Sequence, residues 1–410
     1  MKVLWLSNKV LSPLDSGTTG TWLEAMAQSL SASDGLQLGN ISLGGVCEPS
    51  RQDLGTVSQW VMPAVLRPGG DGLPPRETVA AIVKAVDEFA PDLVHVWGTE
   101  SFWGLLTSRG MIRRPALLEM QGLSLSISSV YGGGLTLLEQ LRCVGLKEIV
   151  RGNSILQGRK RFERWSTLER EMIQGHDFIS TQSSWMRAQV LAMNSGSTVF
   201  TTDRVLRPPF ITGEQWEYHG DPVIFCSAAY SSPFKGLHVA VRSLGLLKRR
   251  FPNVRLHIAG LHQRAGLRRD GYIAWVQGEV RRLGLEENVR WLGALSAGEI
   301  VGEMRRASAI LLPTYVESYC LALAEAMMLG VPAVVTYTGG TSCLARDGES
   351  ALFFAPGDTA MCAYQLERIL SDRELACSIS NMARTVALAR NDTQRIIANQ
   401  IEIYKRLCDR

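Results

Sequence analysis

The chain has 410 residues, with 43 basic and 39 acidic side chains and a net charge of +4. This length predicts two or three domains, each able to build an apolar core without disulfide bonds. A composition of 46% hydrophobic and 20% charged residues excludes a largely disordered chain. With no long basic stripe and no aromatic stacking motif, the small basic excess argues against a nucleic-acid partner.

The cysteines and the N-terminus indicate the compartment. The eight cysteines are scattered, with no C-x-x-C pair and no zinc-like spacing, which indicates small core residues in a reducing environment. The apolar run over residues 3–6 is too short for a signal peptide. No stretch reaches the roughly 18 apolar residues that span a bilayer. We therefore expect a cytoplasmic protein, in which any membrane contact is peripheral at the inner face.

Short apolar strands alternate with helices along the first half of the chain. In chain order, the strands are expected over residues 3–6, 93–97, 116–120 and 177–181, and helices over 22–30 and 79–89. This alternation predicts a parallel sheet with helices on both faces.

The second half restarts the same alternation. Strands are expected over residues 223–226, 254–259, 289–292, 309–312 and 333–335, and helices over 239–249, 272–283, 297–307 and 321–329. Pro208 and Pro209 are expected in the linker between the halves, because two prolines continue neither a helix nor a strand. Two Rossmann-like, doubly wound α/β domains that face one another would place a ligand cleft between the carboxyl ends of their strands.

The sharpest local pattern is a strand, loop and helix over residues 313–332. The loop ends at a helix N-terminus, whose N–H groups and dipole suit a phosphate. Glu317 lies in the loop and Glu325 about two turns into the helix. Two carboxylates so placed can bind hydroxyls on either side of a phosphate. The alternative is that Glu317 helps to cap the helix and Glu325 forms a salt bridge.

This segment resembles the E-x7-E motif of the retaining GT-B glycosyltransferases of family 4, with Glu317 and Glu325 as the two glutamates. Further matches follow in the family's order: Lys235-Gly236, Trp291-Leu292-Gly293, Gly339-Gly340, Asp347-Gly348-Glu349 and Pro356-Gly357-Asp358. The resemblance implies a GT-B fold, with an acceptor domain over 1–207, a nucleotide-sugar domain over 208–391, and a C-terminal helix (392–410) that packs back on the first.

The resemblance also implies roles for individual residues. Glu325 would bind the ribose hydroxyls, Glu317 the transferred sugar, and Lys235 the diphosphate leaving group. Other donor contacts would come from loops at strand ends: Ser318, Tyr319, Cys320, Leu321, Leu292 at the base, and Gly20 and Thr21 of a glycine-rich first loop. Taken alone, without the resemblance, Lys235 is better interpreted as a solvated lysine at a helix start.

Two positions depart from the family pattern. An Arg usually precedes the Lys, whereas Ala229 and Tyr230 occupy that region here. Either a second cation comes from elsewhere, for instance Arg268, or the diphosphate is held more weakly. Gln121 replaces a usual His. Glutamine cannot act as a base, but it can orient a hydroxyl or donate to a sugar oxygen.

The first half resembles a bacterial polysaccharide or glycoconjugate subset of the family, through the stretch 94–100, Gln121-Gly122 and the stretch 205–210. In this half we expect His95 in the core and Glu100 at the acceptor site. No D-x-D pair occurs, which agrees with a metal-independent enzyme without a cofactor.

A basic and aromatic run over 159–165, together with residues 135–151, could lie on an anionic lipid surface. The alternative is a solvated helix face with a buried Trp165.

The expected function is transfer of a hexose from a nucleoside diphosphate sugar, such as a UDP or GDP sugar, to a hydroxyl of a glycan or glycoconjugate. Two alternatives stay open: a sugar-nucleotide epimerase of the same architecture, and a catalytically weak sugar-nucleotide-binding partner subunit.

Overall fold

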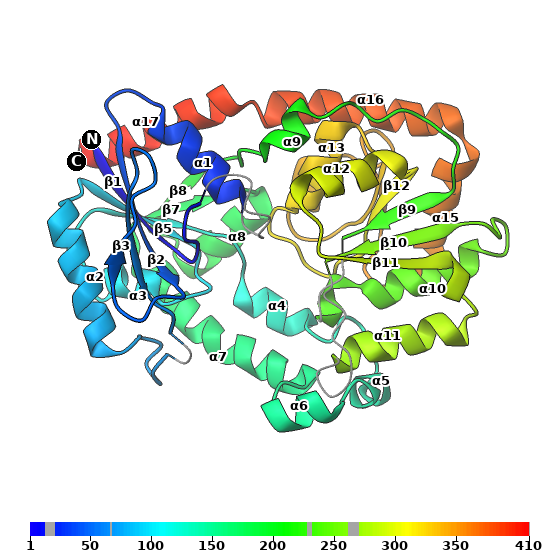
Figure 1. Ribbon diagram of the computed structural model, residues 1–410, viewed down its shortest axis with the longest axis horizontal. Helices are drawn as coiled ribbons and strands as arrows, with labels where there is room; N and C mark the ends of the chain where they lie inside the picture. The colour runs from blue at the N-terminus through cyan, green and yellow to red at the C-terminus, as the bar shows by residue number, and fades with distance from the viewer. Residues whose placement is uncertain (13–20, 66–67, 228–231, 261–269, 410) are drawn as a thin grey trace. The chain divides into compact units, whose positions relative to one another are not determined.

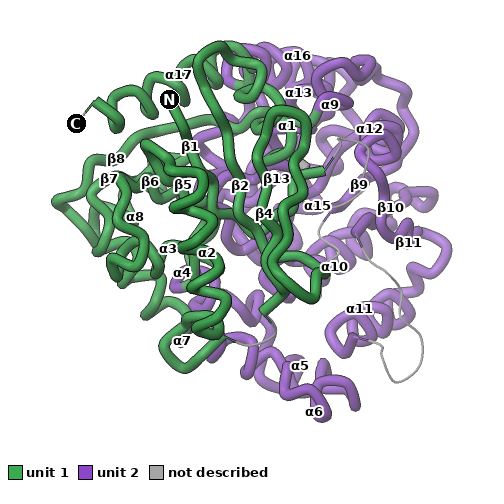
Figure 2. Tube along the Cα trace, turned by 60° about the vertical axis from the view of Figure 1, so that its left-hand side comes forward, with its two compact units in different colours: residues 1–124, 164–207, 391–410 green, residues 125–163, 208–390 purple. Residues whose placement is uncertain are grey.

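The computed structural model describes residues 1–12, 21–65, 68–227, 232–260 and 270–409 (Figure 1). These residues form two compact units (Figure 2). Unit 1 contains residues 1–124, 164–207 and 391–410, and unit 2 contains residues 125–163 and 208–390. The predicted boundary differs for residues 125–163, which belong to the second unit because they pack on helices of that unit.

Unit 1 is built on a sheet that has eight strands in the described residues, in the order β3-β4-β2-β1-β5-β6-β7-β8. Every neighbouring pair is parallel except β3 and β4. The strands are β1 (Lys2–Ser7), β2 (Gln37–Gly44), β3 (Ser50–Arg51), β4 (Ser58–Pro63), β5 (Leu93–Trp97), β6 (Ala116–Glu119), β7 (Phe178–Thr181) and β8 (Thr198–Thr201).

Helices cover both faces of this sheet, so its strands are apolar on both sides. In β1, Leu4 and Leu6 face one apolar cluster, whereas Val3 and Trp5 face the other. The first cluster is closed by α2 (Arg76–Phe89), α3 (Trp103–Ser108), α8 (Ser184–Met193) and the end of α7 (Ile155–Gln174). The second is closed by α1 (Thr21–Ser31) and the C-terminal helix α17 (Thr393–Cys408).

Unit 2 contains a fully parallel sheet with six strands in the described residues, in the order β11-β10-β9-β12-β13-β14. The strands are β9 (Val223–Cys226), β10 (Arg255–Ala259), β11 (Val289–Gly293), β12 (Ala309–Leu312), β13 (Ala333–Thr336) and β14 (Leu352–Phe354). Counted from β9, this is the 3-2-1-4-5-6 order of nucleotide-binding Rossmann folds.

Figure 1 shows α10 and α11 on one side of these strands and α12 and α13 on the other. The longer helices are α10 (Leu237–Leu247), α11 (Gly271–Arg282), α12 (Ala297–Arg306), α13 (Leu321–Leu329), α15 (Thr359–Ser371) and α16 (Arg373–Arg390). The short ones are α4 (Ser124–Val130), α5 (Leu137–Arg142), α6 (Leu146–Arg151), α9 (Pro208–Thr212), α14 (Thr341–Leu344) and the 3₁₀ turns η1 (Pro233–Lys235) and η3 (Glu286–Asn288).

Two expectations need correction. Pro208 and Pro209 lie at the boundary between the two units, as expected, but they begin α9, because a proline in the first turn of a helix loses no intrahelical hydrogen bond. Of the eight cysteines, none of which forms a disulfide, only Cys143, Cys226, Cys320 and Cys362 are buried, and Cys47 and Cys343 are exposed. Among the described residues, no helix has the length and apolarity to cross a membrane.

Candidate active site

Lys235 and Glu317 meet at the point where the strand order of unit 2 reverses. The reversal lies between β9 and β12, and in doubly wound sheets the ligand crevice opens there, beyond the strands' carboxyl ends. Lys235 lies in the loop after β9, and Glu317 in the loop after β12. The Lys235 Nζ lies 2.6 Å from Oε1 of Glu317, and the side chains are 26% and 18% exposed. The pair is therefore accessible from solvent.

The two loops that carry this pair are joined through the backbone. The N–H of Tyr315 donates to the carbonyl of Phe234 (2.7 Å). Gly236 ends η1 with a positive φ of 75°, and a Cβ there would lie 1.9 Å from the Pro313 carbonyl oxygen. Only glycine permits this approach. Lys235 is thus held in place by backbone contacts, while its side chain reaches the carboxylate.

A third loop, after β13, supports Glu317 from the other side. The N–H of Gly340 donates to the Glu317 carbonyl (2.8 Å), and the Thr338 hydroxyl donates to the Tyr315 carbonyl (2.8 Å). The Thr336 hydroxyl donates to the Thr314 carbonyl (2.6 Å). Three loops at one edge of the sheet therefore fix the backbone of the Glu317 loop.

Helix α13 follows this loop directly and carries Glu325, which is only 3% exposed. Residues 323–329 are all buried, so α13 is a core helix, apolar around most of its circumference. Cys320 precedes the helix in the left-handed region (φ 72°), which is rare for a residue with a side chain and occurs mostly where function requires it. Burial raises the pKa of the Cys320 thiol, which disfavours its thiolate form.

The loop after β9 is covered by residues 131–134, from a part of the chain that the sequence assigned to the other domain. The Tyr131 and Phe234 ring centroids are 5.7 Å apart. A Cβ on Gly133, which has a positive φ of 58°, would lie 2.3 Å from the Pro233 carbonyl oxygen. Sequence reasoning missed this contact, although the run of glycines over 132–134 is the kind of signal that marks a close backbone approach.

In unit 1, Glu100 and Gln121 lie together at the carboxyl ends of β5 and β6. A Cβ on Gly98 would lie 2.1 Å from Oε2 of Glu100 and 3.3 Å from Cδ of Gln121, so both side chains lie against Gly98. Glu100 is exposed and Gln121 is half-buried. The strand order of this sheet reverses between β1 and β5. The two side chains therefore lie beside the ligand crevice that such a reversal opens.

Glu169, which sequence reasoning missed, lies buried behind these residues. Its carboxylate accepts hydrogen bonds from the Thr99 hydroxyl (2.7 Å) and from the Ser124 N–H (2.7 Å). Burial raises the pKa of Glu169 to about 7, against those hydrogen bonds, and the charge of Glu100 acts in the same direction as burial. This carboxyl group joins the loop after β5 to the start of α4.

His95 is a core residue, as expected, and it is completely buried. Trp5 Nε1 donates to the Tyr404 hydroxyl (3.2 Å), which lies 2.7 Å from His95 Nδ1. The second ring nitrogen of His95, Nε2, lies 3.5 Å from Oε2 of Glu119.

Glu119 is the charged centre of this buried network. Arg204 NH2 lies 2.9 Å from Oε1 of Glu119. Burial opposes ionisation of Glu119, but Arg204 and then His95 outweigh it and lower its pKa to about 2. The network fixes the end of β6, two residues before Gln121.

The remaining predicted donor residues fall into two groups. Ser318, Tyr319, Cys320 and Leu321 connect the Glu317 loop to α13, and Leu292 lies near the carboxyl end of β11. Gly20 and Arg268 lie outside the described residues, as do Ala229 and Tyr230; Thr21 begins α1, and its side chain is not described. Within the described ranges, no group of three or more His, Cys, Asp or Glu side chains could hold a metal ion.

The part of the chain that matches a known protein family lies in unit 2. Residues 212–386, less than half of the chain, match the family of glycosyl transferases group 1. A glycogen synthase of Mycobacterium tuberculosis (strain CDC 1551 / Oshkosh) is 28% identical over 170 residues, 42% of this chain and 39% of that protein. A D-inositol 3-phosphate glycosyltransferase of Nocardia farcinica (strain IFM 10152) is 31% identical over 157 residues, 38% of this chain and 34% of that protein. The chain thus spans little more than a third of the length of these relatives.

Similarity to solved structures extends over the whole chain. A sucrose-phosphate synthase from Thermosynechococcus elongatus has a TM-score of 0.73 at 15% identity, covering 99% of this chain and 98% of that one. Anabaena Alr3699/HepE, solved in complex with UDP and glucose, has a TM-score of 0.68 at 16% identity, covering 99% of both chains. The expected fold is confirmed: the chain has the GT-B fold, with two Rossmann-like parallel-sheet units.

Proposed function

We propose that the protein is a retaining glycosyltransferase that moves a hexose from a nucleoside diphosphate sugar to a hydroxyl of a glycan or glycoconjugate. The observation that carries this proposal is the Lys235–Glu317 ion pair at the strand reversal of unit 2, followed directly by α13 with Glu325. The match of residues 212–386 to glycosyl transferases group 1 supports it.

In this proposal Lys235 receives the diphosphate. Its ammonium carries three donors and contacts Glu317 at the edge where the diphosphate would bind. Departure of a nucleoside diphosphate builds negative charge on those oxygens, and a positioned cation stabilises charge as it develops. The backbone contacts of Gly236 and Phe234 keep the lysine in that position without further reorganisation.

The two glutamates of the Glu317–Glu325 pair have separate tasks. Glu325, buried at 3% exposure, would accept hydrogen bonds from the ribose hydroxyls. Glu317, more exposed and bound to Lys235, would accept from hydroxyls of the transferred sugar. Ser318, Tyr319, Cys320 and Leu321 would place backbone N–H groups near the phosphates, and Leu292 would lie near the base. Anabaena Alr3699/HepE has also been solved in complex with UDP-glucose, a nucleoside diphosphate sugar of the class proposed here.

The proposed reaction requires neither a protein base nor a metal ion. The bond between the anomeric carbon and the diphosphate oxygen breaks, and the acceptor oxygen bonds to the same face of the sugar. The acceptor proton passes to the departing phosphate oxygen. Gln121 fits this scheme because its amide can orient the acceptor hydroxyl, although it cannot remove a proton. A chelator such as EDTA is accordingly expected to leave the rate unchanged.

Unit 1 would bind the acceptor. Glu100 is exposed and Gln121 is half-buried against Gly98, so a carboxylate and an amide are together available for sugar hydroxyls. A sugar-nucleotide epimerase and a partner subunit that only binds sugar nucleotides are the alternatives to be tested.

The deciding experiment measures release of nucleoside diphosphate from UDP-, GDP- and ADP-sugars, with and without a panel of glycan and glycolipid acceptors. We expect release that depends on an acceptor, and a product whose anomeric configuration by NMR equals that of the donor. Change of the donor sugar without an acceptor identifies an epimerase. Binding without turnover across the whole panel identifies a partner subunit, and an inverted product excludes the retaining mechanism.

A further inference from the structure

An apolar surface stands out on residues 137–156 of unit 2. The described residues leave 17 large hydrophobic side chains exposed, and eight of them fall within these 20 positions. We call these eight the α5–α6 surface: Leu137, Leu138, Leu141, Val144, Leu146, Ile149, Val150 and Leu156. Ile149 and Val150 are 68% and 83% exposed. Monomeric soluble proteins rarely expose apolar side chains in such a concentration, except at interaction sites.

The apolar sides of α5 and α6 face outward because polar side chains on their other sides bind to neighbouring helices of unit 2. Glu139 of α5 forms an ion pair with Arg242 of α10. Glu148 of α6 accepts from the N–H groups of Gly145 (2.9 Å) and Gly271 (3.2 Å), and Lys147 Nζ lies 2.9 Å from Oδ2 of Asp270. The segment is therefore fastened to α10 and α11, and the orientation of its leucines is fixed by the fold.

The charges around the surface are mainly positive. The acidic side chains Glu139 and Glu148 are bound inward, and Glu163 is 2.9 Å from Arg159. Arg142 and Arg151, in the last turns of α5 and α6, are exposed and form no ion pair with any residue that the structure describes. An apolar face bordered by unpaired arginines is typical of elements that lie in the interface of an anionic membrane.

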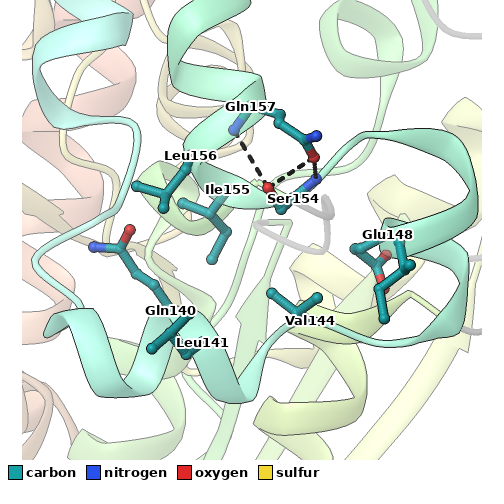
Figure 3. Close-up of a pocket in the computed structure, with 9 residues that line it drawn as sticks. Gln140, Leu141, Val144, Glu148, Ser154, Ile155, Leu156 and Gln157 are labelled. Atoms are coloured by element: carbon teal, nitrogen blue, oxygen red, sulfur yellow. Dashed lines mark hydrogen bonds between the residues drawn. The ribbon is translucent and has the colours of Figure 1, made fainter.

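A cavity of about 310 Å³ adjoins the α5–α6 surface. It lies between α5, α6 and the first turn of α7, and Leu141, Val144, Ile155 and Leu156 supply its apolar lining (Figure 3). Ser154 and Gln157 at its edge hydrogen-bond to each other, with the Ser154 N–H 2.9 Å from Oε1 of Gln157. An apolar cavity that opens beside exposed leucines offers room for part of a lipid chain.

Neither aromatic residue of the neighbouring basic run joins this surface. The Phe162 ring packs against Tyr131, with the ring centroids 5.4 Å apart. Trp165 Nε1 donates to the Thr99 carbonyl (2.7 Å), and its ring packs against the core of unit 1. Contact with lipid would therefore come from the leucines, isoleucine and valines of α5 and α6, assisted by arginines, and not from an aromatic anchor.

We propose that the α5–α6 surface docks the protein on an anionic lipid bilayer. A second copy of the chain fits less well, because a symmetric interface would bring Arg142 and Arg151 of one copy against the same surface of the other. Docking does not require the glycosyltransferase activity, so the two proposals can fail separately.

The test is sedimentation of the protein with vesicles of pure phosphatidylcholine and with vesicles in which about a third of the lipid is phosphatidylglycerol. We expect binding to the anionic vesicles that weakens with salt. The double variant Leu138→Ser/Ile149→Ser should lose about tenfold or more in affinity, since it removes two apolar side chains from the interface. Arg142→Gln/Arg151→Gln should lose roughly 30-fold on anionic vesicles and little on neutral ones.

The matched control is Met382→Ser/Leu388→Ser, which removes two exposed apolar side chains of α16 elsewhere on unit 2. It should bind as the wild type does, and unchanged melting temperatures verify that all variants fold. The proposal would be overturned if Leu138→Ser/Ile149→Ser and Arg142→Gln/Arg151→Gln bound anionic vesicles as tightly as the wild type does. It would also be overturned if the wild type did not bind anionic vesicles. A dimer in sedimentation velocity that Leu138→Ser/Ile149→Ser dissociates would assign the surface to a second copy instead.

Discussion

The ammonium of Lys235 and the carboxylate of Glu317 are 2.6 Å apart, although 82 positions separate the two residues in the chain. They meet because β9 and β12 are neighbours in the sheet, so the loops that follow these strands leave the same edge side by side. The strand order that reverses there is what opens a nucleotide-sized crevice in Rossmann folds. The strand order of unit 2 thus places this pair where the proposed chemistry requires it.

Replacing Lys235 with Gln should lower kcat by about a hundred- to a thousand-fold, the usual cost of losing one donor that stabilises developing charge. The measurement is acceptor-dependent release of nucleoside diphosphate under saturating donor. Lys84→Gln is the matched control, because Lys84 is an exposed lysine of α2 in the other unit. A variant of Lys235 that keeps more than half of the wild-type kcat would show that this lysine is a solvated surface residue.

Replacing Glu317 with Gln should separate catalysis from product binding. The change frees the charge of Lys235, so a nucleoside diphosphate without its sugar should bind more tightly by about 1 kcal/mol, roughly fivefold. Turnover should fall, because glutamine offers the sugar one uncharged acceptor oxygen in place of a carboxylate, and hydrogen bonds to an uncharged oxygen are weaker. Calorimetry with UDP and GDP, together with initial rates, tests both effects. If the diphosphate binds more weakly and kcat is unchanged, Glu317 serves only to support the loop.

Tyr404→Phe tests the buried network of unit 1. The change removes the hydroxyl that accepts from Trp5 Nε1 and contacts His95 Nδ1, and leaves both nitrogens buried without that partner. We expect the free energy of unfolding to fall by about 1–3 kcal/mol, measured by urea denaturation. Tyr364→Phe, at a tyrosine that is 54% exposed, should change it by less than about 0.5 kcal/mol. Equal effects of the two substitutions would contradict the assigned hydrogen bonds.

Glu169 should make stability depend on pH near neutrality. Burial raises its folded-state pKa from 4.5 to about 7. Between these values the folded protein holds a proton that the unfolded chain has lost, so the free energy of unfolding falls as pH rises from 4.5 to about 7. The loss is up to about 3 kcal/mol.

The variant Glu169→Gln keeps the shape and hydrogen-bonding capacity of the side chain without the titration. We expect its stability to change less than that of the wild type across this pH interval, and to exceed that of the wild type at pH values above about 8. Parallel pH profiles of the two proteins by urea denaturation would show that Glu169 titrates normally.

Much of the parallel-sheet framework followed from short apolar runs. Among the strands that were missed, β14 lies in such a run over residues 351–355, whereas the pattern of β2 is interrupted by a polar residue. In β2, Asn40 is buried and bonded to Ser7 (2.9 Å) and Gln59 (3.0 Å). A polar residue in the middle of a strand breaks the apolar pattern, because its partners come from elements distant in the sequence. β4, which carries Gln59, was also missed, although Trp60, Val61 and Met62 are apolar and buried.

In the candidate site, too, some residues could be predicted from local sequence and others could not. Lys235, Glu317 and Glu325 could be proposed from local motifs, because each lies in a strand-loop-helix segment that is continuous in the chain. The cover formed by Tyr131 and Gly133 could not, since about a hundred residues separate these positions from the loop after β9 that they contact. Glu169 was missed because its raised pKa comes from burial, which no local pattern reveals.

The most direct test of the central proposal is calorimetric titration of UDP-, GDP- and ADP-glucose into the wild type, Glu325→Gln and the surface control Glu77→Gln. We predict that at least one of these donors binds the wild type and Glu77→Gln alike, and that Glu325→Gln binds it at least about tenfold more weakly at an unchanged melting temperature. If no donor binds the wild type, or if Glu325→Gln binds as tightly as the wild type, the assigned nucleotide-sugar site is wrong.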